Sequence, residues 1–165
     1  MWVLEAKQLK ELLLIVAGFI LAHMPGVFDR KRKLKTHWHV IRAEMLLCKW
    51  QAETLLNAEI PAPLYRLPVV AYSTSFPVLL SEGAVTEDDA LKIGRCFSQM
   101  QDINRGLDYA SEMYKLGNNE KLGKEHERNC LKAKTLFFGS NGEENLFDPA
   151  KRIVDSKIEV PWWRY

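Results

Sequence analysis

An uncharged, apolar run near the N-terminus limits the folds open to this chain. Residues 12–28 read LLLIVAGFILAHMPGVF and contain no Asp, Glu, Lys or Arg. At about 1.5 Å per residue, a helix over this run would be roughly 25 Å long, the short limit of a membrane span. Flanking Lys and Arg side chains extend the usable length because their charged ends reach the interface. We therefore predict an N-terminal transmembrane helix, with residues 1–29 as the membrane anchor.

Two other interpretations of this run compete with the anchor. A cleaved signal peptide needs small residues of the A-x-A kind near its end, and the sequence has none there. A buried core helix is the open alternative, because Gly18, His23 and the Pro25-Gly26 pair interrupt the apolar pattern.

Basic residues are distributed unevenly around the run. Only Lys7 and Lys10 precede it, whereas five basic residues follow it within six positions. The five are Arg30, Lys31, Arg32, Lys33 and Lys35. Since basic flanks remain on the cytoplasmic side, we predict a single-pass membrane protein with its N-terminus outside and the bulk of the chain in the cytoplasm. The same five side chains are candidate contacts for lipid headgroups.

The rest of the chain has the composition of one folded domain. Of its 165 residues, 47% are hydrophobic and 27% are charged, which is typical of a globular protein. Lys and Arg number 23 and Asp and Glu 21, but seven basic and three acidic residues precede Thr36, so the remainder is slightly acidic. This balance argues against nucleic acid as a partner. Cys48, Cys96 and Cys130 are widely spaced, which indicates reduced thiols rather than disulfides or a zinc site.

After the basic block, apolar residues recur with helical spacing. Apolar positions follow one another in steps of four and three residues, in a helix that should end near residue 58. These positions are Leu34, Trp38, Ile41, Met45, Cys48, Ala52 and Leu55. Such a seam suits either the stalk of an oligomer or the first helix of a bundle. Trp38, Ile41 and Met45 are its candidate interaction residues.

Proline, glycine and capping residues divide the following segment. Residues 61–68 (PAPLYRLP) predict an extended connector, packed by Leu64, Tyr65 and Leu67. Helices are expected over residues 69–80, from the Thr86 cap to about 116, and over about 120–137. Residues 139–165 are expected to be an irregular tail with a short extended piece around 153–160. The predicted fold class is all-α: a transmembrane helix followed by a cytoplasmic antiparallel helical bundle over residues 30–138.

Three short segments resemble a set of bacterial proteins. APLYRLP (62–68), NRGLD (104–108) and ERNCLKAK (127–134), after a basic membrane flank, are similar to uncharacterised bacterial single-pass membrane-anchored helical proteins. The resemblance covers most of residues 30–134. It implies a membrane anchor followed by a helical bundle, and it implies no activity, cofactor or catalytic residue.

Motifs for common enzyme classes are missing from the sequence. It contains no G-x-x-x-x-G-K-[ST], no G-x-S-x-G and no H-E-x-x-H, so we expect no enzyme activity, no cofactor and no metal site. Polar residues on apolar stripes are the better candidates for a site: Arg66, Asn104, Arg105 and Arg128. They are either internal struts, paired with Asp108, Glu127 or Glu44, or the lining of a pocket for an anionic small molecule.

The chain ends in aromatic residues. Trp162, Trp163 and Tyr165 are candidate contacts for a partner or for lipid headgroups, and the alternative is that they cap an apolar groove of the bundle. The sequence as a whole favours a membrane-tethered, non-enzymatic interaction protein, acting as a scaffold or accessory subunit through a protein partner or self-association. The alternative is a membrane-anchored sensor whose bundle binds an anionic small molecule through its arginines.

Overall fold

The computed structural model is built from α-helices. It describes residues 6–58, 60–139 and 144–160, and the side chains among them except those of residues 6–9, 20, 21 and 23. Its elements are α1 (Ala6–Asn57), α2 (Val70–Ser81), α3 (Glu87–Lys115), α4 (Asn119–Phe138) and α5 (Phe147–Glu159), and no strand occurs in the described ranges. The all-α prediction is confirmed.

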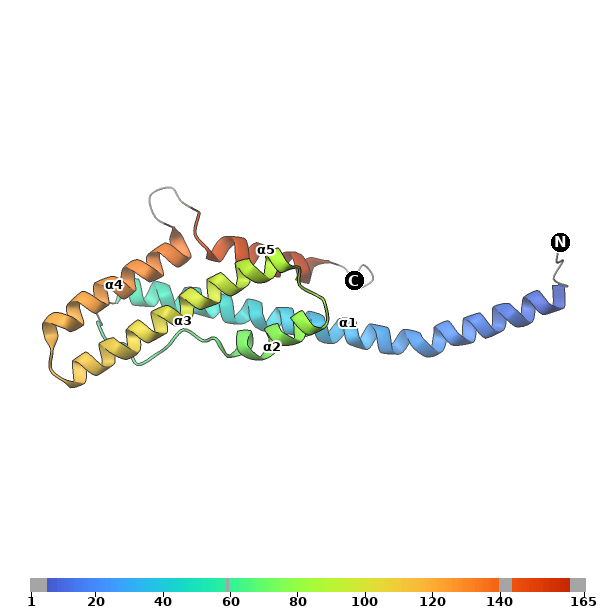
Figure 1. Cartoon of the computed structure of the whole chain (residues 1–165), viewed down its shortest axis with the longest axis horizontal. Helices are drawn as coiled ribbons and strands as arrows, with labels where there is room; N and C mark the ends of the chain where they lie inside the picture. Colours follow the sequence, from blue (N-terminus) through green and yellow to red (C-terminus); the bar gives the residue numbers. More distant parts are fainter. Residues whose placement is uncertain (1–5, 59, 140–143, 161–165) are drawn as a thin grey trace.

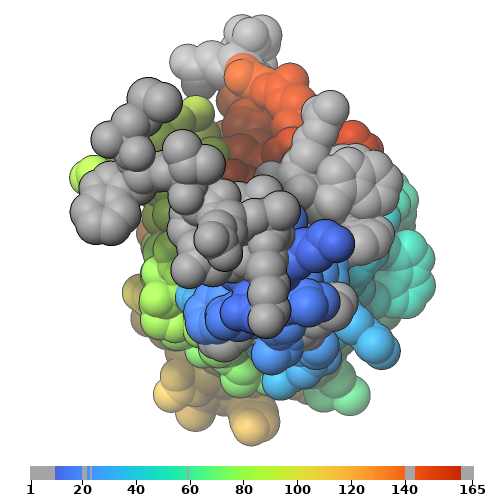
Figure 2. All heavy atoms as spheres, turned by 90° about the vertical axis from the view of Figure 1, so that its right-hand side faces the viewer, coloured from blue at the N-terminus to red at the C-terminus, as the bar shows by residue number. Residues whose placement is uncertain are grey.

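A single helix contains both the apolar run and the seam that follows it. α1 is 52 residues long and continues through Pro25. Its N-terminal half extends away from the other helices (Figure 1), and Figure 2 looks along it from that end, with α1 in blue in the foreground. This half is long and apolar enough to cross a membrane, and none of its most apolar window is buried in the protein. The apolar run is therefore not a core helix of this chain.

The second half of α1 packs against α2, α4 and α5. We call α1 from Leu34 onward, together with α2–α5, the helical body. α1 contacts α2, α4 and α5, and α3 lies against α4 and α5. The predicted seam faces this core, and Trp38, Ile41 and Met45 have no exposed surface. Their assignment as residues that contact a partner is therefore wrong, because the chain's own helices already cover the seam.

Capping residues begin α3 and α4 close to the predicted positions. The Thr86 hydroxyl accepts a hydrogen bond from the Asp89 N–H at 3.2 Å at the start of α3. The Asn118 side chain does the same for Lys121 at the start of α4, also at 3.2 Å. Between α3 and α4, Gly117 has a φ of 67°, a conformation that glycine adopts without strain.

The expected irregular tail is wrong for residues 147–159, which form α5. Phe147, Ala150 and Val154 are completely buried in the core. Their spacing is helical, and Pro149 lies in the first turn, where a helix needs no N–H donor. Burial of these three apolar side chains therefore stabilises a helix over residues 147–159. Trp162, Trp163 and Tyr165 lie outside the described residues.

Candidate functional site

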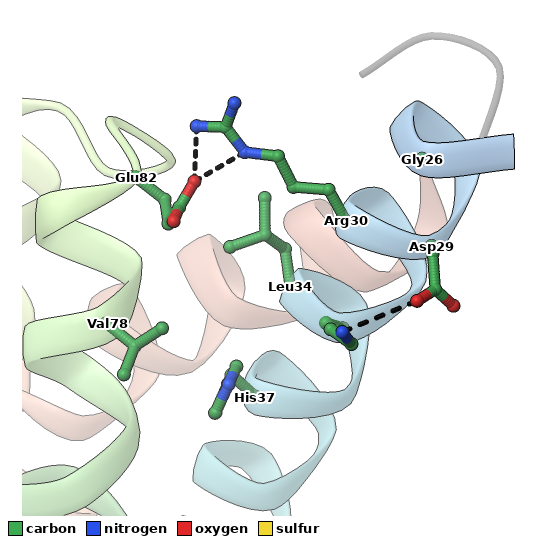
Figure 3. Close-up of a pocket in the computed structure, with 8 residues that line it drawn as sticks. Gly26, Asp29, Arg30, Leu34, His37, Val78 and Glu82 are labelled. Atoms are coloured by element: carbon green, nitrogen blue, oxygen red, sulfur yellow. Dashed lines mark hydrogen bonds and ion pairs between the residues drawn. The ribbon is translucent and has the colours of Figure 1, made fainter. Parts of the chain in front are cut away.

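A pocket lies where α1 leaves the helical body. Its volume is about 470 Å³, and it opens just after the apolar run. Gly26, Arg30, Lys33 and His37 line it from α1, and Val78 and Glu82 line it from the end of α2. Figure 3 shows Arg30 extending from α1 to Glu82, with Leu34 and His37 one and two turns further along the helix. The pocket therefore lies at the boundary between the apolar segment and the helical body.

Ion pairs balance the charges in this pocket. The Arg30 guanidinium donates to the Glu82 carboxylate, and Lys33 Nζ lies 3.4 Å from an Asp29 oxygen. Two of the five predicted lipid contacts are thus paired with carboxylates of the same chain. The other three, Lys31, Arg32 and Lys35, lie on α1 with fully or partly exposed side chains.

A buried carboxylate attaches the start of α2 to α1. The Glu44 Oε1 accepts the Ala71 N–H at 3.0 Å, and its Oε2 accepts the Tyr72 N–H at 2.7 Å. The residue before α2, Val69, provides no side-chain cap, so Glu44 supplies the acceptors for the free N–H groups. Two turns before Glu44 on α1, His37 Nδ1 lies 3.0 Å from the Ser75 hydroxyl. Sequence reasoning treated Glu44 only as a possible partner for an arginine.

Arg66 fastens the connector to α3. Its Nε donates to Asp108 Oδ1 at 2.6 Å, and Nη1 donates to the carbonyls of Pro63 and Tyr65 at 2.7 and 2.8 Å. Its Nη2 donates to the Leu107 carbonyl at 3.3 Å and to the Ser111 hydroxyl at 3.0 Å. A guanidinium has five N–H groups, and all five have acceptors here. Arg66 is therefore a structural strut, and its partner Asp108 is one of the three carboxylates predicted as possible partners of the arginines.

Asn104 holds the next residue of the connector. Its Oδ1 accepts the Leu67 N–H at 2.8 Å, and its Nδ2 donates to the Leu67 carbonyl at 2.8 Å. Leu67 is buried and Tyr65 half-buried, as expected of residues that pack the connector, whereas Leu64 is 98% exposed. The prediction for Leu64 is wrong because Arg66 and Asn104 fix the turn of the connector so that Leu64 faces away from α3.

The other two candidate arginines lie elsewhere on α3 and α4. Both have exposed side chains near Asp102, which binds Lys132 Nζ at 2.7 Å. The hydrogen bond from Lys132, with smaller effects of Arg105 and Arg128, holds the pKa of Asp102 below its usual value. The four predicted ligand residues therefore fall into two pairs: Arg66 and Asn104 join the connector to α3, whereas Arg105 and Arg128 lie near Asp102 on the exposed surface of α3 and α4.

The three cysteines are free thiols inside the helical body. Cys48 and Cys96 are buried, and Cys130 is partly buried with its Sγ 3.7 Å from His126 Nε2. Burial raises the pKa of Cys96 to about 12 and also raises the pKa of Cys130. Since the thiolate is the nucleophilic form, these environments favour unreactive thiols. Within the described ranges, no three His, Cys, Asp or Glu side chains are grouped as metal ligands.

An apolar face of α1 points away from the core. Val40, Ala43, Leu47 and Trp50 lie on it in steps of three, four and three, and Trp50 is 61% exposed. A groove of about 400 Å³ runs between this face and the start of α2, where Val70 also is exposed. The apolar periodicity of this helix is already accounted for by the buried seam, so the sequence alone does not single out this second, exposed face.

The three segments that carry the sequence resemblance meet in space. Residues 62–68 bind residues 104–108 through Arg66 and Asn104. Gly106, in the second segment, lies against the side chain of Asn129 in the third. They form one junction between the connector, α3 and α4. No protein-family model, curated protein or solved structure matches this chain.

Proposed function

We propose that this chain is a membrane-tethered, non-enzymatic interaction protein, acting as a scaffold or accessory subunit. The observation that carries the proposal is the continuity of α1. One helix contains an exposed apolar segment and the central packing face of the helical body, so the body is attached to its anchor without a flexible linker. A protein built in this way holds its body at a fixed place beside a membrane.

The proposal includes a location and an orientation. The protein would be a single-pass component of the bacterial inner membrane, with its N-terminus outside and the helical body, an antiparallel bundle, in the cytoplasm. The basic residues from Arg30 to Lys35 support this orientation because they follow the apolar run directly. The pocket beside Arg30 and Glu82 would then lie at the level of the lipid headgroups.

Protein binding suits the surface better than ligand binding. The exposed row from Val40 to Trp50 offers an apolar, uncharged surface of the kind that partners cover. A sensor that binds an anionic small molecule is the weaker proposal, because every N–H of Arg66 already has an acceptor within the chain.

Membrane fractionation with an alkaline carbonate wash tests the anchor. We expect the full-length protein to remain in the membrane pellet. Leu14→Arg, in the apolar segment, should shift protein to the supernatant because a charge in the bilayer costs about 3 kcal/mol. Leu131→Arg, at an exposed position of α4, is the matched control and should stay in the pellet. Release of the unsubstituted protein would contradict the proposal.

A labelling experiment tests the orientation. In intact cells with a permeabilised outer membrane, a membrane-impermeant maleimide should label Lys10→Cys and should label Ser98→Cys only after lysis. Lys10 precedes the apolar run, and Ser98 is exposed on α3. The unsubstituted protein controls for its own thiols. The opposite labelling pattern would show that the orientation is reversed.

A further inference from the structure

We propose that α1 pairs in parallel with α1 of a second copy of this chain, through two apolar patches on one side of the helix. This outer face consists of Gly18 and Ala22 in the apolar segment and of Val40, Ala43, Leu47 and Trp50 in the helical body. The inference rests on the proposed membrane anchoring, and it names the partner that the interaction surface would take.

The body part of the outer face has the spacing of a coiled-coil seam. Val40, Ala43, Leu47 and Trp50 follow one another in steps of three, four and three residues. All four are exposed, with Val40 at 43% and Leu47 at 44%. Single exposed apolar side chains are normal on a protein surface, but a heptad-spaced row on one helix matches what a second helix covers. None of the described residues covers this row.

Charge favours a second copy as the occupant. In a symmetric parallel pair, each residue at the centre of the interface faces the same residue of the other chain, so a charge there would repel itself. The four body positions of the outer face are uncharged. Charged residues on the neighbouring turns are engaged within the chain: Arg42 binds Asp155 at 2.7 Å, and Glu44 binds the start of α2. The surface is therefore compatible with its own copy.

The apolar segment carries small residues on the same side of α1. Gly18, Ala22 and Gly26 are spaced four apart, a pattern that lets two membrane helices approach closely. Nothing lies within 4 Å of a Cβ built on Gly18 or Gly26. Ala22 and Val40 are eighteen residues apart, about five helical turns, and Gly18 and Ala43 are twenty-five apart, about seven turns. Each pair therefore lies on one face of the helix.

A shared membrane would align the two copies. Two chains inserted in the same orientation have parallel α1 helices, with each residue at the same depth as its counterpart. The two outer faces then meet in register from Gly18 to Trp50 without any rearrangement of the body. Asp29 and Arg32 lie on the same side of α1 between the two parts of the face, eighteen residues before Leu47 and Trp50, so the apolar contacts are confined to the two parts on either side of them. Asp29 forms an ion pair with Lys33 within the chain.

Cysteine crosslinking of the full-length protein in its membrane tests the proposal. Ala43 is exposed on the outer face, so Ala43→Cys should give a crosslinked dimer with a short bismaleimide. Ser98→Cys, exposed on α3, is the matched control, and the unsubstituted protein shows the background of the native thiols. At least five times more dimer for Ala43→Cys than for Ser98→Cys is expected. Equal amounts would overturn the proposal, as would crosslinking of Ala43→Cys to a different protein.

Introducing a charge into the outer face tests the same pairing without crosslinking. Leu47→Glu places two carboxylates against each other. It should reduce the amount of dimer at least tenfold, as determined from the molecular mass of the protein in mild detergent. Leu131→Glu, 63% exposed on α4, should leave it unchanged. Coexpression of Leu47→Glu with Leu47→Lys should restore a mixed dimer, and absence of rescue with both variants folded by circular dichroism would contradict the pairing. A monomer that stays in the membrane pellet refutes this inference alone, whereas release by carbonate refutes the proposed function.

Discussion

At Gly106, α3 and α4 lie closer together than a side chain would allow. A Cβ built at this position would lie 1.9 Å from Asn129 Oδ1 and 2.7 Å from its Cγ. Asn129 has no exposed surface, and neither polar atom of its side chain has a hydrogen-bond partner among the described residues. An unpaired buried amide costs free energy, so this contact specifies how the helices fit together and does not add stability through hydrogen bonds.

Substitution of Gly106 should therefore reverse the usual effect of replacing glycine in a helix. Gly106→Ala should lower the free energy of unfolding by about 1–3 kcal/mol, because the added methyl overlaps Asn129. Gly123→Ala, in α4 with nothing within 4 Å of a built Cβ, should raise it by up to about 1 kcal/mol. Urea unfolding followed by circular dichroism measures both. Equal effects of the two substitutions would show that α3 and α4 are not in close contact at Gly106.

Arg66 should be irreplaceable even by lysine. Arg66→Lys keeps the charge and loses the planar group that reaches five acceptors, so we expect a loss of about 1.5–3 kcal/mol of unfolding free energy. Arg105→Lys, on the exposed surface of α3, should change it by no more than about 0.5 kcal/mol. Thermal unfolding of the two variants in parallel provides the comparison. A stability of Arg66→Lys equal to that of the unsubstituted protein would mean that the connector is held by its apolar contacts alone.

At the scale of helices, local signals account for what the sequence predicts. The heptad seam of α1, the Thr86 cap of α3 and the Gly117 turn each depend on residues close in the chain, and each is found in the structure. α5 differs from the predicted irregular tail although the spacing of Phe147, Ala150 and Val154 is a local helical signal. The segment is short, and it is stabilised by burial of these side chains against helices far away in the sequence. The contacts of Asp155 with α1 likewise join residues far apart in sequence.

Acid should weaken the attachment of α5 to α1. Burial alone would raise the pKa of Asp155, but Lys151 and Arg42 outweigh it, and the pKa lies below its usual value. The fold therefore stabilises the charged form. This stabilisation is complete above the unfolded-state pKa of about 3.9, and it disappears as the pH falls through the lower pKa of the folded protein.

Asp155→Asn isolates that contribution. At neutral pH the substitution should lower the free energy of unfolding by about 1–2 kcal/mol, because Arg42 and Lys151 lose a charged acceptor. As the pH falls through the lowered pKa of the native Asp155 carboxyl, the difference from the unsubstituted protein should shrink toward zero. Unfolding in urea across this pH range measures it. A difference that stays constant with pH would show that the loss is one of packing.

At the scale of the whole molecule, the sequence separates an apolar segment from a helical part but does not show how they join. The sequence marks Arg66 and Asp108 as candidates for an ion pair, but it leaves open which arginine binds which carboxylate. Arg30 and Glu82 are not marked in this way, since nothing near either residue in the sequence indicates that the end of α2 returns to the start of the helical body. The pocket at this junction results from chain topology.

Removal of the apolar segment should leave the helical body intact. A fragment of residues 30–165 should be soluble and unfold within a few degrees of the full chain in detergent, because the most apolar window of α1 buries nothing. A fragment of residues 44–165 lacks Trp38 and Ile41, which are completely buried, and should not fold cooperatively. Differential scanning calorimetry distinguishes the two. Loss of the cooperative transition in the longer fragment would show that the body depends on its anchor.

The continuity of α1 also fixes the azimuth of its apolar segment. Successive residues of a helix are about 100° apart around its axis, so turning α1 by one residue would take Trp38, Met45 and Cys48 out of the core. The body thus opposes axial rotation of the helix that holds it. Which side chains the apolar segment presents in each direction is determined by packing many residues further along the chain. A substitution deep in the helical body that changes the rotation of α1 would therefore change which side chains the apolar segment presents in each direction.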